Sequence, residues 1–109
     1  MLQRHPESFT ERVFTDAENA YCSQGKRQST EHYTGRWAAK EAILKALGTG
    51  WSSGITWRDI EILNEPGGKP FVRLTGAAAE IARNKGISEI QISISHCTSH
   101  AVAFAVAIG

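Results

Sequence analysis

The stretch GRWAAKEAILKALGTG, residues 35–50, decides what kind of fold this chain can adopt. It has the pattern of an α-helix interrupted by four charged side chains, and it runs into a Gly-Thr-Gly tail. Upstream, Ser29 or Thr30 offers an N-cap, and downstream Gly48 supplies the permissive backbone that commonly ends a helix. The sequence therefore predicts a long helix that begins at Ser29 or Thr30 and ends at Leu47.

The charges of this helix fall into two pairs. At about 100° per residue, Arg36 and Lys40 form one i,i+4 pair, whereas Glu41 and Lys45 form a second pair on a different side. The apolar flanks between the pairs are Trp37 and Leu44 on one side and Ala38, Ala39, Ala42, Ile43 and Ala46 on the other. We expect a helix clamped on two apolar flanks, with its charges in the seams.

Two interpretations of these pairs are open. In the first, Glu41 and Lys45 form a surface ion pair worth a few tenths of a kcal/mol, and Arg36 and Lys40 are solvated cations. In the second, three cations and one carboxylate line a cleft for phosphates and a divalent metal, since Mg²⁺ commonly takes one or two carboxylates plus phosphate oxygens. The Gly-Thr-Gly tail permits close backbone approach, but the spaced glycine and the Gly-Lys-Ser/Thr of a P-loop are absent.

The remaining segments predict a mixture of helices and antiparallel strands. Thr15 and Glu18 form a capping box that starts a short helix from about Asp16 to Cys22. The last run, HAVAFAVAI, is apolar on both faces, which favours a central, covered strand. The other expected elements are a helical turn at 7–13, a hairpin of strands 59–63 and 70–74, a helix at 76–85 and a strand at 89–95 paired with the strand 100–108. The fold class is α+β, with a small, mostly antiparallel sheet packed against helices in a single domain, residues 1–109.

Bulk composition excludes several classes of protein. The chain has 109 residues, with 12 Lys and Arg against 11 Asp and Glu. This balance argues against binding duplex nucleic acid, which needs a broad basic surface. Two cysteines, Cys22 and Cys97, do not make a disulfide framework, so we interpret both as reduced thiols. The N-terminus has no apolar signal region and no run could span a bilayer, so we expect a soluble, cytoplasmic protein.

Other candidate residues near the C-terminus are weaker. His96 ends a strand at a sheet edge, where loops carry function, although a lone histidine there is more often a hydrogen-bonded turn residue. His96, Cys97 and His100 loosely resemble metal ligands, but no second cluster has zinc spacing. Ser93 and Ser95 lack a nucleophile elbow, which argues against a hydrolase.

The motif GRWAAKEAILKALGTG, followed by WRDIEILN, GGKP and SISH, resembles the holo-acyl-carrier-protein synthase family of 4′-phosphopantetheinyl transferases. The similarity runs from about Phe9 to near the C-terminus and keeps the order and spacing of the blocks. It implies transfer of the phosphopantetheine arm of coenzyme A to a serine of an apo acyl carrier protein. The products would be the holo carrier protein and adenosine 3′,5′-bisphosphate, with Mg²⁺ required and a role in fatty-acid biosynthesis.

The resemblance also implies roles for individual residues. Glu41 matches a metal ligand and Lys45 a catalytic cation near the diphosphate. Arg12 matches the early helical region that meets the acidic carrier protein. The other matches are to the coenzyme-binding part of the family's motifs, at Arg36, Lys40, Gly48, Thr49 and His96. The family is typically a homotrimer with active sites between subunits, which fits a chain with a small core.

The resemblance is incomplete at the N-terminus. Family members begin with a strand that carries a Gly-x-Asp signature, whose aspartate is a second metal ligand, and this sequence starts downstream of it. Either the chain is a truncated version of an active enzyme, or it is a short form that binds coenzyme A or carrier protein without efficient catalysis. We expect the former, and we expect the chain as given to bind metal poorly. The acceptor of the serine proton is either a metal-bound water or Glu41.

Overall fold

The computed structural model describes residues 12–23, 29–48, 54–96 and 101–109. Arg12 and Val13 are helical, and residues 7–11 of the expected helical turn lie outside this range. The named elements are α2 (Asp16–Cys22), α3 (Ser29–Leu47), the 3₁₀ turn η1 (Trp57–Asp59), β1 (Ile60–Asn64), β2 (Pro70–Leu74), α4 (Gly76–Asn84), β3 (Glu89–His96) and β4 (Ala101–Ile108). The predicted α+β class is therefore confirmed.

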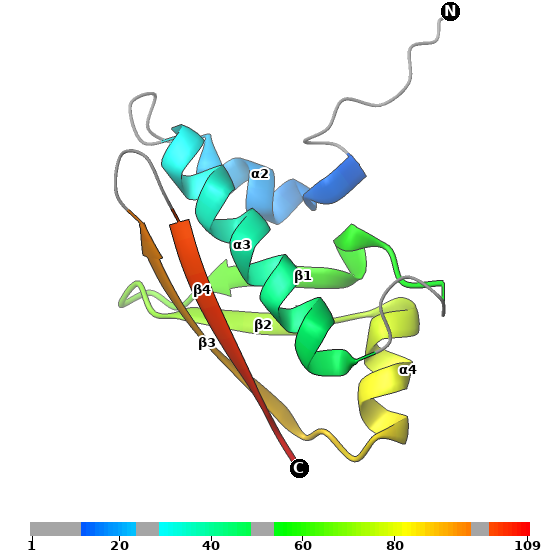
Figure 1. Cartoon of the computed structure of the whole chain (residues 1–109). Coiled ribbons are helices and arrows are strands. Elements are labelled where there is room, and N and C mark those ends of the chain that lie inside the picture. The colour runs from blue at the N-terminus through cyan, green and yellow to red at the C-terminus, as the bar shows by residue number, and fades with distance from the viewer. Residues whose placement is uncertain (1–11, 24–28, 49–53, 97–100) are drawn as a thin grey trace, which may run out of the picture.

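The strands form two antiparallel hairpins (Figure 1). β1 pairs with β2, with Ile60 opposite Leu74, and β3 pairs with β4, with Glu89 opposite Ile108. Both hairpins were predicted, but as parts of one sheet, and the structure has two sheets whose neighbouring strands β2 and β3 form no ladder. The long helix α3 lies across both hairpins, as Figure 1 shows, and α4 lies beyond the ends of β2 and β3. One helix thus packs against strands of both hairpins, β1 in the first and β3 and β4 in the second.

The start of α2 is set by the capping box that the sequence predicted. The Thr15 hydroxyl accepts a hydrogen bond from the Glu18 backbone N–H at 3.2 Å, and the Thr15 N–H donates to Glu18 Oε1 at 2.9 Å. Both contacts satisfy backbone donors that a helix start leaves without partners. The helix ends at Cys22, in agreement with the predicted bounds.

The core lies between α3 and the strands. Ala39, Ile43 and Leu47 are buried along one side of α3, and Ile60 and Ile62 of β1 are buried against them. Complete burial of one such aliphatic side chain contributes about 1.5–3 kcal/mol, so this contact is a main source of stability. None of the helices in the described part of the chain is long and apolar enough to cross a membrane.

The prediction that β4 is a central, covered strand is wrong for the chain taken alone. Ala103 and Ala105 pack toward the core, whereas the larger side chains on the other face are exposed: Val102 by 51%, Phe104 by 68% and Val106 by 58%. The reason is that α3 needs small residues to approach β4 closely, so the alanine face points inward. A row of large apolar side chains is left on the outer face of the hairpin.

Candidate active site on helix α3

The two charged pairs of α3 lie on different faces of the helix, one buried and one exposed. Arg36 and Lys40 are buried, whereas Glu41 and Lys45 are exposed. This corrects the expectation that all four charges lie in seams beside apolar flanks. The spacing carried the signal, because positions 36, 40, 43 and 47 follow the i, i+4, i+7 pattern of a buried helix face. Because Arg36 and Lys40 are charged, they were not predicted from the sequence to lie on this buried face.

Lys40 is the most deeply buried charge of the helix, with no exposed surface. Its ammonium lies 2.9 Å from Glu18 Oε1, and it donates to the backbone oxygens of Trp57, at 2.9 Å, and Ile60. An ammonium has three N–H donors, so these three acceptors use its whole capacity. The expectation that Lys40 contributes to a coenzyme pocket disagrees with this placement, because no donor is left for a ligand. Burial lowers the pKa of Lys40, and the neighbouring Glu18 carboxylate opposes that shift.

Sequence reasoning recognised Glu18 only as a capping residue, and it also holds this buried charge. Glu18 has no exposed surface, and its Oε2 accepts a hydrogen bond from the Ile62 N–H at 2.7 Å. The carboxylate therefore contacts the start of α2, the lysine of α3 and the backbone of β1. A capping glutamate normally lies at the surface, so the sequence alone carried no signal for the contacts with Lys40 and Ile62.

Arg36 is 5% exposed and lies between α2 and β1. Its guanidinium carbon is 4.3 Å from the centre of the Tyr21 ring, which is a cation–π distance, and its Nη2 donates to Asn64 Oδ1. Its buried Nε has no hydrogen-bond partner among the described residues. Buried N–H groups usually have partners, so this donor is an exception among the buried polar groups of the described residues.

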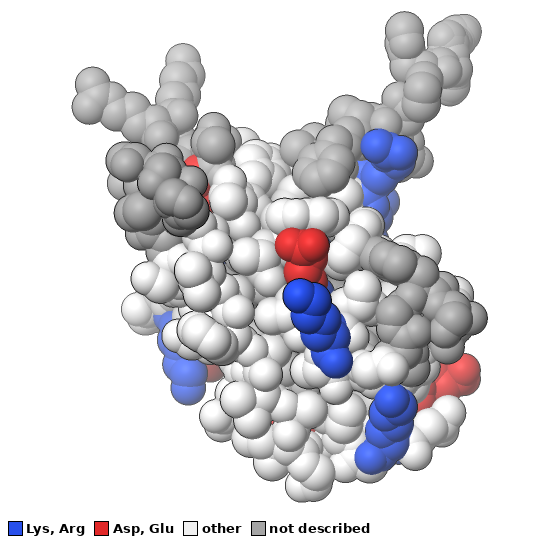
Figure 2. Space-filling view, in the orientation of Figure 1, with Lys and Arg blue, Asp and Glu red and all other residues white. Residues whose placement is uncertain are grey.

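Glu41 and Lys45 face outward, one turn of the helix apart. In Figure 2 the surface over α3 is mostly uncharged, with one acidic and one basic group next to each other. The ion pairs of the described residues are Lys40–Glu18, Arg58–Asp16 and Arg73–Glu61. Glu41 and Lys45 are in none of them, which disagrees with the interpretation of the pair as a surface ion pair.

The exposed face of α3 fits Mg²⁺ only if the substrate supplies some of the ligands. No cluster of three or more His, Cys, Asp or Glu side chains occurs in the described residues. Mg²⁺ is often held by one or two carboxylates and completes its coordination with substrate phosphates and water. The exposed Glu41 carboxylate meets that requirement together with a phosphate-bearing substrate.

The other predicted site residues are spread over the fold. Gly48 follows α3 with φ +79, a left-handed conformation that favours glycine, and its N–H bonds to the Leu44 oxygen at 3.2 Å. Thr49 lies outside the described residues. His96 is the last residue of β3, opposite Ala101. Arg12 is exposed on the helical segment before Thr15.

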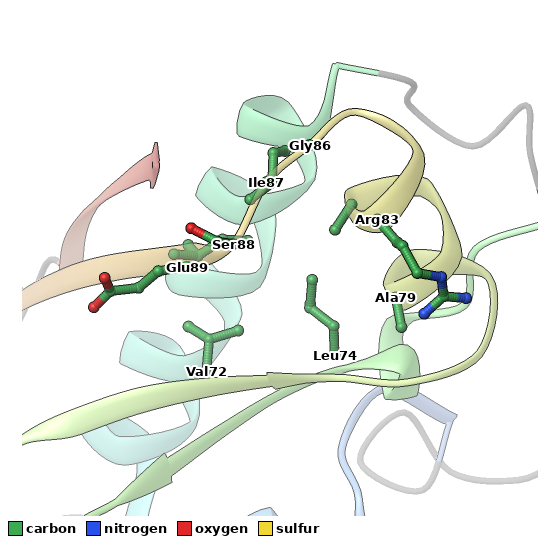
Figure 3. Close-up of a pocket in the computed structure, with 10 residues that line it drawn as sticks. Val72, Leu74, Ala79, Arg83, Gly86, Ile87, Ser88 and Glu89 are labelled. Carbon is green, nitrogen blue, oxygen red and sulfur yellow. The ribbon is translucent and has the colours of Figure 1, made fainter. Parts of the chain in front are cut away.

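A pocket of about 520 Å³ lies where β2 and β3 separate, beside α4. Figure 3 shows Val72 and Leu74 of β2 and Ile87, from the segment before β3, around this space, with Arg83 and Glu89 at its margin. None of the predicted site residues lines it. The candidate site is thus the exposed face of α3, together with Gly48 at the end of α3 and His96 at the end of β3. The pocket beside α4 is a separate feature.

Comparison with known proteins agrees with the motif. Residues 1–105 match the model of the 4′-phosphopantetheinyl transferase superfamily. The holo-[acyl-carrier-protein] synthase of Desulforudis audaxviator is 52% identical over 98 residues, which are 90% of this chain and 73% of that protein.

Solved structures show the same fold. The crystal structure of holo-[acyl-carrier-protein] synthase from Neisseria meningitidis is 32% identical with a TM-score of 0.82, over 93% of this chain and 80% of that one. The Helicobacter pylori synthase, solved in complex with coenzyme A, is 29% identical with a TM-score of 0.77, over 92% and 81%. The chain therefore belongs to the holo-acyl-carrier-protein synthase family of the 4′-phosphopantetheinyl transferase superfamily.

Proposed function

We propose that this chain transfers the 4′-phosphopantetheine group of coenzyme A to a serine of an apo acyl carrier protein. The products are the holo carrier protein and adenosine 3′,5′-bisphosphate. The observation that carries the proposal is the exposed pair Glu41 and Lys45 on α3 of a chain that belongs to this family. A carboxylate and an ammonium one helical turn apart, with no ion-pair partner among the described residues, suit a metal and a diphosphate.

The reaction exchanges one phosphorus–oxygen bond for another. The serine oxygen attacks the phosphorus on the pantetheine side of the diphosphate, and the bond from that phosphorus to the bridging oxygen breaks. The electron pair of that bond leaves with adenosine 3′,5′-bisphosphate, and the serine proton passes to a base. Catalysis of such a transfer consists mainly of positioning and charge stabilisation, which are tasks for fixed cations.

Lys45 suits charge stabilisation and Arg36 suits binding. The exposed ammonium of Lys45 can lie against the diphosphate and withdraw negative charge as the leaving group departs. Arg36 is held in place by Tyr21 and Asn64, and we propose it as a coenzyme contact from its position in the family motif. Gly48, Thr49 and His96 complete the proposed coenzyme site, and Arg12 contacts the carrier protein.

Mg²⁺ is the proposed metal, and Glu41 is its proposed protein ligand. When bound, the ion supplies Lewis-acid polarisation of the diphosphate oxygens. The support is the chemistry of the donor, an exposed carboxylate on the same helix face as the phosphate-binding cation.

We propose that the active assembly is a homotrimer. The support is the outer face of the β3–β4 hairpin, where Val102, Phe104 and Val106 are all at least half exposed. Their cross-strand neighbours Ser95, Ser93 and Gln91 are polar, so an apolar row borders a polar one. Contiguous exposed apolar surface of this kind marks an interaction site. We also propose a cytoplasmic location and, from the family resemblance, a role in fatty-acid biosynthesis.

The test is direct transfer. The chain is incubated with coenzyme A, an apo acyl carrier protein and an excess of MgCl₂, because we expect it to bind metal weakly, and the mass of the carrier is measured by mass spectrometry. We expect the carrier mass to rise by one phosphopantetheine group, and we expect no rise with EDTA or with a carrier whose acceptor serine is alanine. Binding of coenzyme A without transfer under any divalent metal would contradict the proposal and favour a non-catalytic binding module.

A further inference from the structure

The ion pair between Glu18 and Lys40 is the most enclosed charged contact in the described residues, since neither side chain has any exposed surface. It is too far inside to touch a substrate. Lys40 nevertheless precedes Glu41 directly in α3, so whatever holds the Lys40 side chain also holds the backbone that carries Glu41.

The contacts of the pair reach four separate elements. Glu18 belongs to α2 and also accepts from the Ile62 N–H of β1. Lys40 belongs to α3 and donates to the backbone oxygens of Trp57, in η1, and Ile60, in β1. Rotation of α3, or a shift along its axis, would break several of these bonds together. The same turn is held on a second side, because the rings of Trp37 and Trp57 lie 4.5 Å apart.

On the outward face of the helix, no comparable contact within the described residues holds Glu41 and Lys45. Glu41 and Lys45 are exposed and form no ion pair within the described parts of the chain. Their positions before substrate binds therefore depend on where the α3 backbone lies. Mg²⁺ demands near-ideal octahedral geometry, and a misplacement of about 1 Å in an active site can cost about 10²-fold in rate.

Stability alone does not explain a buried ion pair. Removing two charges from water is costly, and well-packed apolar residues of similar volume are often as stabilising or more so. A buried ion pair with directional hydrogen bonds instead restricts the neighbouring elements to one arrangement.

We propose that Glu18 and Lys40 are positioning residues for the transfer, and that their ion pair sets the rotation and depth of α3 so that Glu41 and Lys45 meet metal and diphosphate. This inference rests on the proposed function and changes the predicted role of Lys40 from a coenzyme contact to a support behind the active face. It also connects α2, which follows the proposed carrier-contact residue Arg12, to α3 and β1 through Glu18.

The test compares the full chain with Glu18→Gln, Lys40→Met and the double variant. For each protein, kcat, the melting temperature and the calorimetric Kd for coenzyme A are measured, with kinetic assays well below the lowest melting temperature. Glu18→Gln keeps the shape of the side chain, so this variant is the one expected to remain folded. We expect kcat to fall about 10²-fold in each single variant, which is the usual effect of misplaced catalytic groups. We expect this fold-loss in kcat to be larger than the fold-rise in the Kd for coenzyme A. We expect the double variant to lose no more than the worse single variant, because a pair that acts as a unit is non-additive.

The matched control is Ala78→Gly, a buried site in α4 where glycine lowers stability without touching the pair. We expect it to lower the melting temperature and leave kcat unchanged. The inference is overturned if the Glu18 and Lys40 variants keep the kcat of the unmodified chain, if their losses multiply in the double variant, or if the control loses as much. Absence of transfer by the unmodified chain would instead contradict the proposed function, so the two failures are distinct.

Discussion

Lys40 and Glu41 are adjacent in α3 and have opposite environments. Lys40 has no exposed surface and lies 2.9 Å from the Glu18 carboxylate, whereas Glu41 faces outward. A rotation of about 100° along the helix separates the proposed positioning residue Lys40 from the proposed metal ligand Glu41. The two residues can therefore be tested independently, since substitution of one should alter packing and substitution of the other should not.

Glu41→Gln should abolish phosphopantetheine transfer while leaving the protein folded. The amide is nearly isosteric but cannot supply the negative charge that the proposed Mg²⁺ site requires. Because the side chain is exposed, the free energy of unfolding should change by about 0.5 kcal/mol or less. Carrier mass and urea unfolding measure the two effects. Glu80→Gln, at an exposed position of α4, is the control and should keep full activity; full turnover by Glu41→Gln would remove Glu41 from the site.

Lys45→Met should reduce kcat by about 10²–10³-fold, the usual cost of losing one group that stabilises charge in the transition state. The side chain is exposed, so folding should be unaffected. Steady-state kinetics at saturating coenzyme A give the value. Arg83→Met, which removes an exposed cation from α4, should leave kcat unchanged. Equal losses in the two variants would mean that net charge, and not the position of Lys45, affects the rate.

Glu61 should contribute to an acid-dependent loss of stability. Burial alone would raise the pKa of this carboxyl, but hydrogen bonds from Thr15 and Arg73 and the charge of Arg73 outweigh it and hold the pKa below its ordinary value of 4.5. A depressed folded-state pKa stabilises the protein above the unfolded-state pKa, and this contribution disappears as pH falls through the folded-state pKa.

The measurement for Glu61 is urea unfolding, followed by tryptophan fluorescence, between roughly pH 6 and pH 3. The free energy of unfolding should fall across this window in the unmodified chain and fall less steeply in Glu61→Gln. If the free energy of unfolding fell equally steeply with pH in the two proteins, Glu61 would not be a cause of the acid-dependent loss of stability.

Phe104→Ser should prevent or weaken self-association. The Phe104 side chain is 68% exposed in a single chain and lies between Val102 and Val106 on the outer face of β4, so an interface there would lose its central apolar group. Light scattering coupled to size exclusion should give three times 11.9 kDa for the unmodified chain and a smaller mass for the variant. Phe71→Ser, at an exposed position of β2, is the comparison. A monomeric unmodified chain at all concentrations would contradict the homotrimer.

Cys22 should resist thiol reagents while the protein is folded. It is fully buried, and burial raises the pKa of its thiol to about 11, so little of the reactive thiolate is present near neutral pH. The rate of reaction with a chromogenic disulfide, measured in a Cys97→Ala background, should be slow in buffer and fast in urea. Rapid modification in buffer would mean that α2 opens readily.

The sequence predicted local structure better than it predicted what the charged residues contact. The bounds of α2 and β2 agree with prediction, because a capping box and a proline-bounded β-prone run are local signals. Ser29 is already helical and was proposed as a cap, a difference within the usual fraying of a helix end. The separation of the strands into two sheets was not predictable, since it depends on where β2 and β3 diverge in space.

Resemblance named the residues of the candidate site but not their depth. Glu41 and Lys45 lie on the exposed face, as a substrate site requires. Lys40 belongs to the same short motif and is buried, because its partner Glu18 lies on another helix and no periodicity connects them. Similarly, the alternation in β4 was recognised, but which face points inward depends on how closely α3 approaches the alanines.

The contact between Lys85 and the end of α3 limits which substitutions positions 47, 48 and 85 can accept. The Lys85 ammonium donates to the backbone oxygen of Leu47 at 2.6 Å and lies 3.2 Å from the point where a Cβ on Gly48 would stand. Since the acceptor at position 47 is a main-chain atom, any apolar residue that fits the core can replace Leu47 without losing the bond. Position 85 has no such freedom, and a side chain at position 48 would press on the lysine. Among variants of this chain, we expect position 47 to interchange aliphatic residues while position 48 remains glycine, because its φ of +79 strains any other residue.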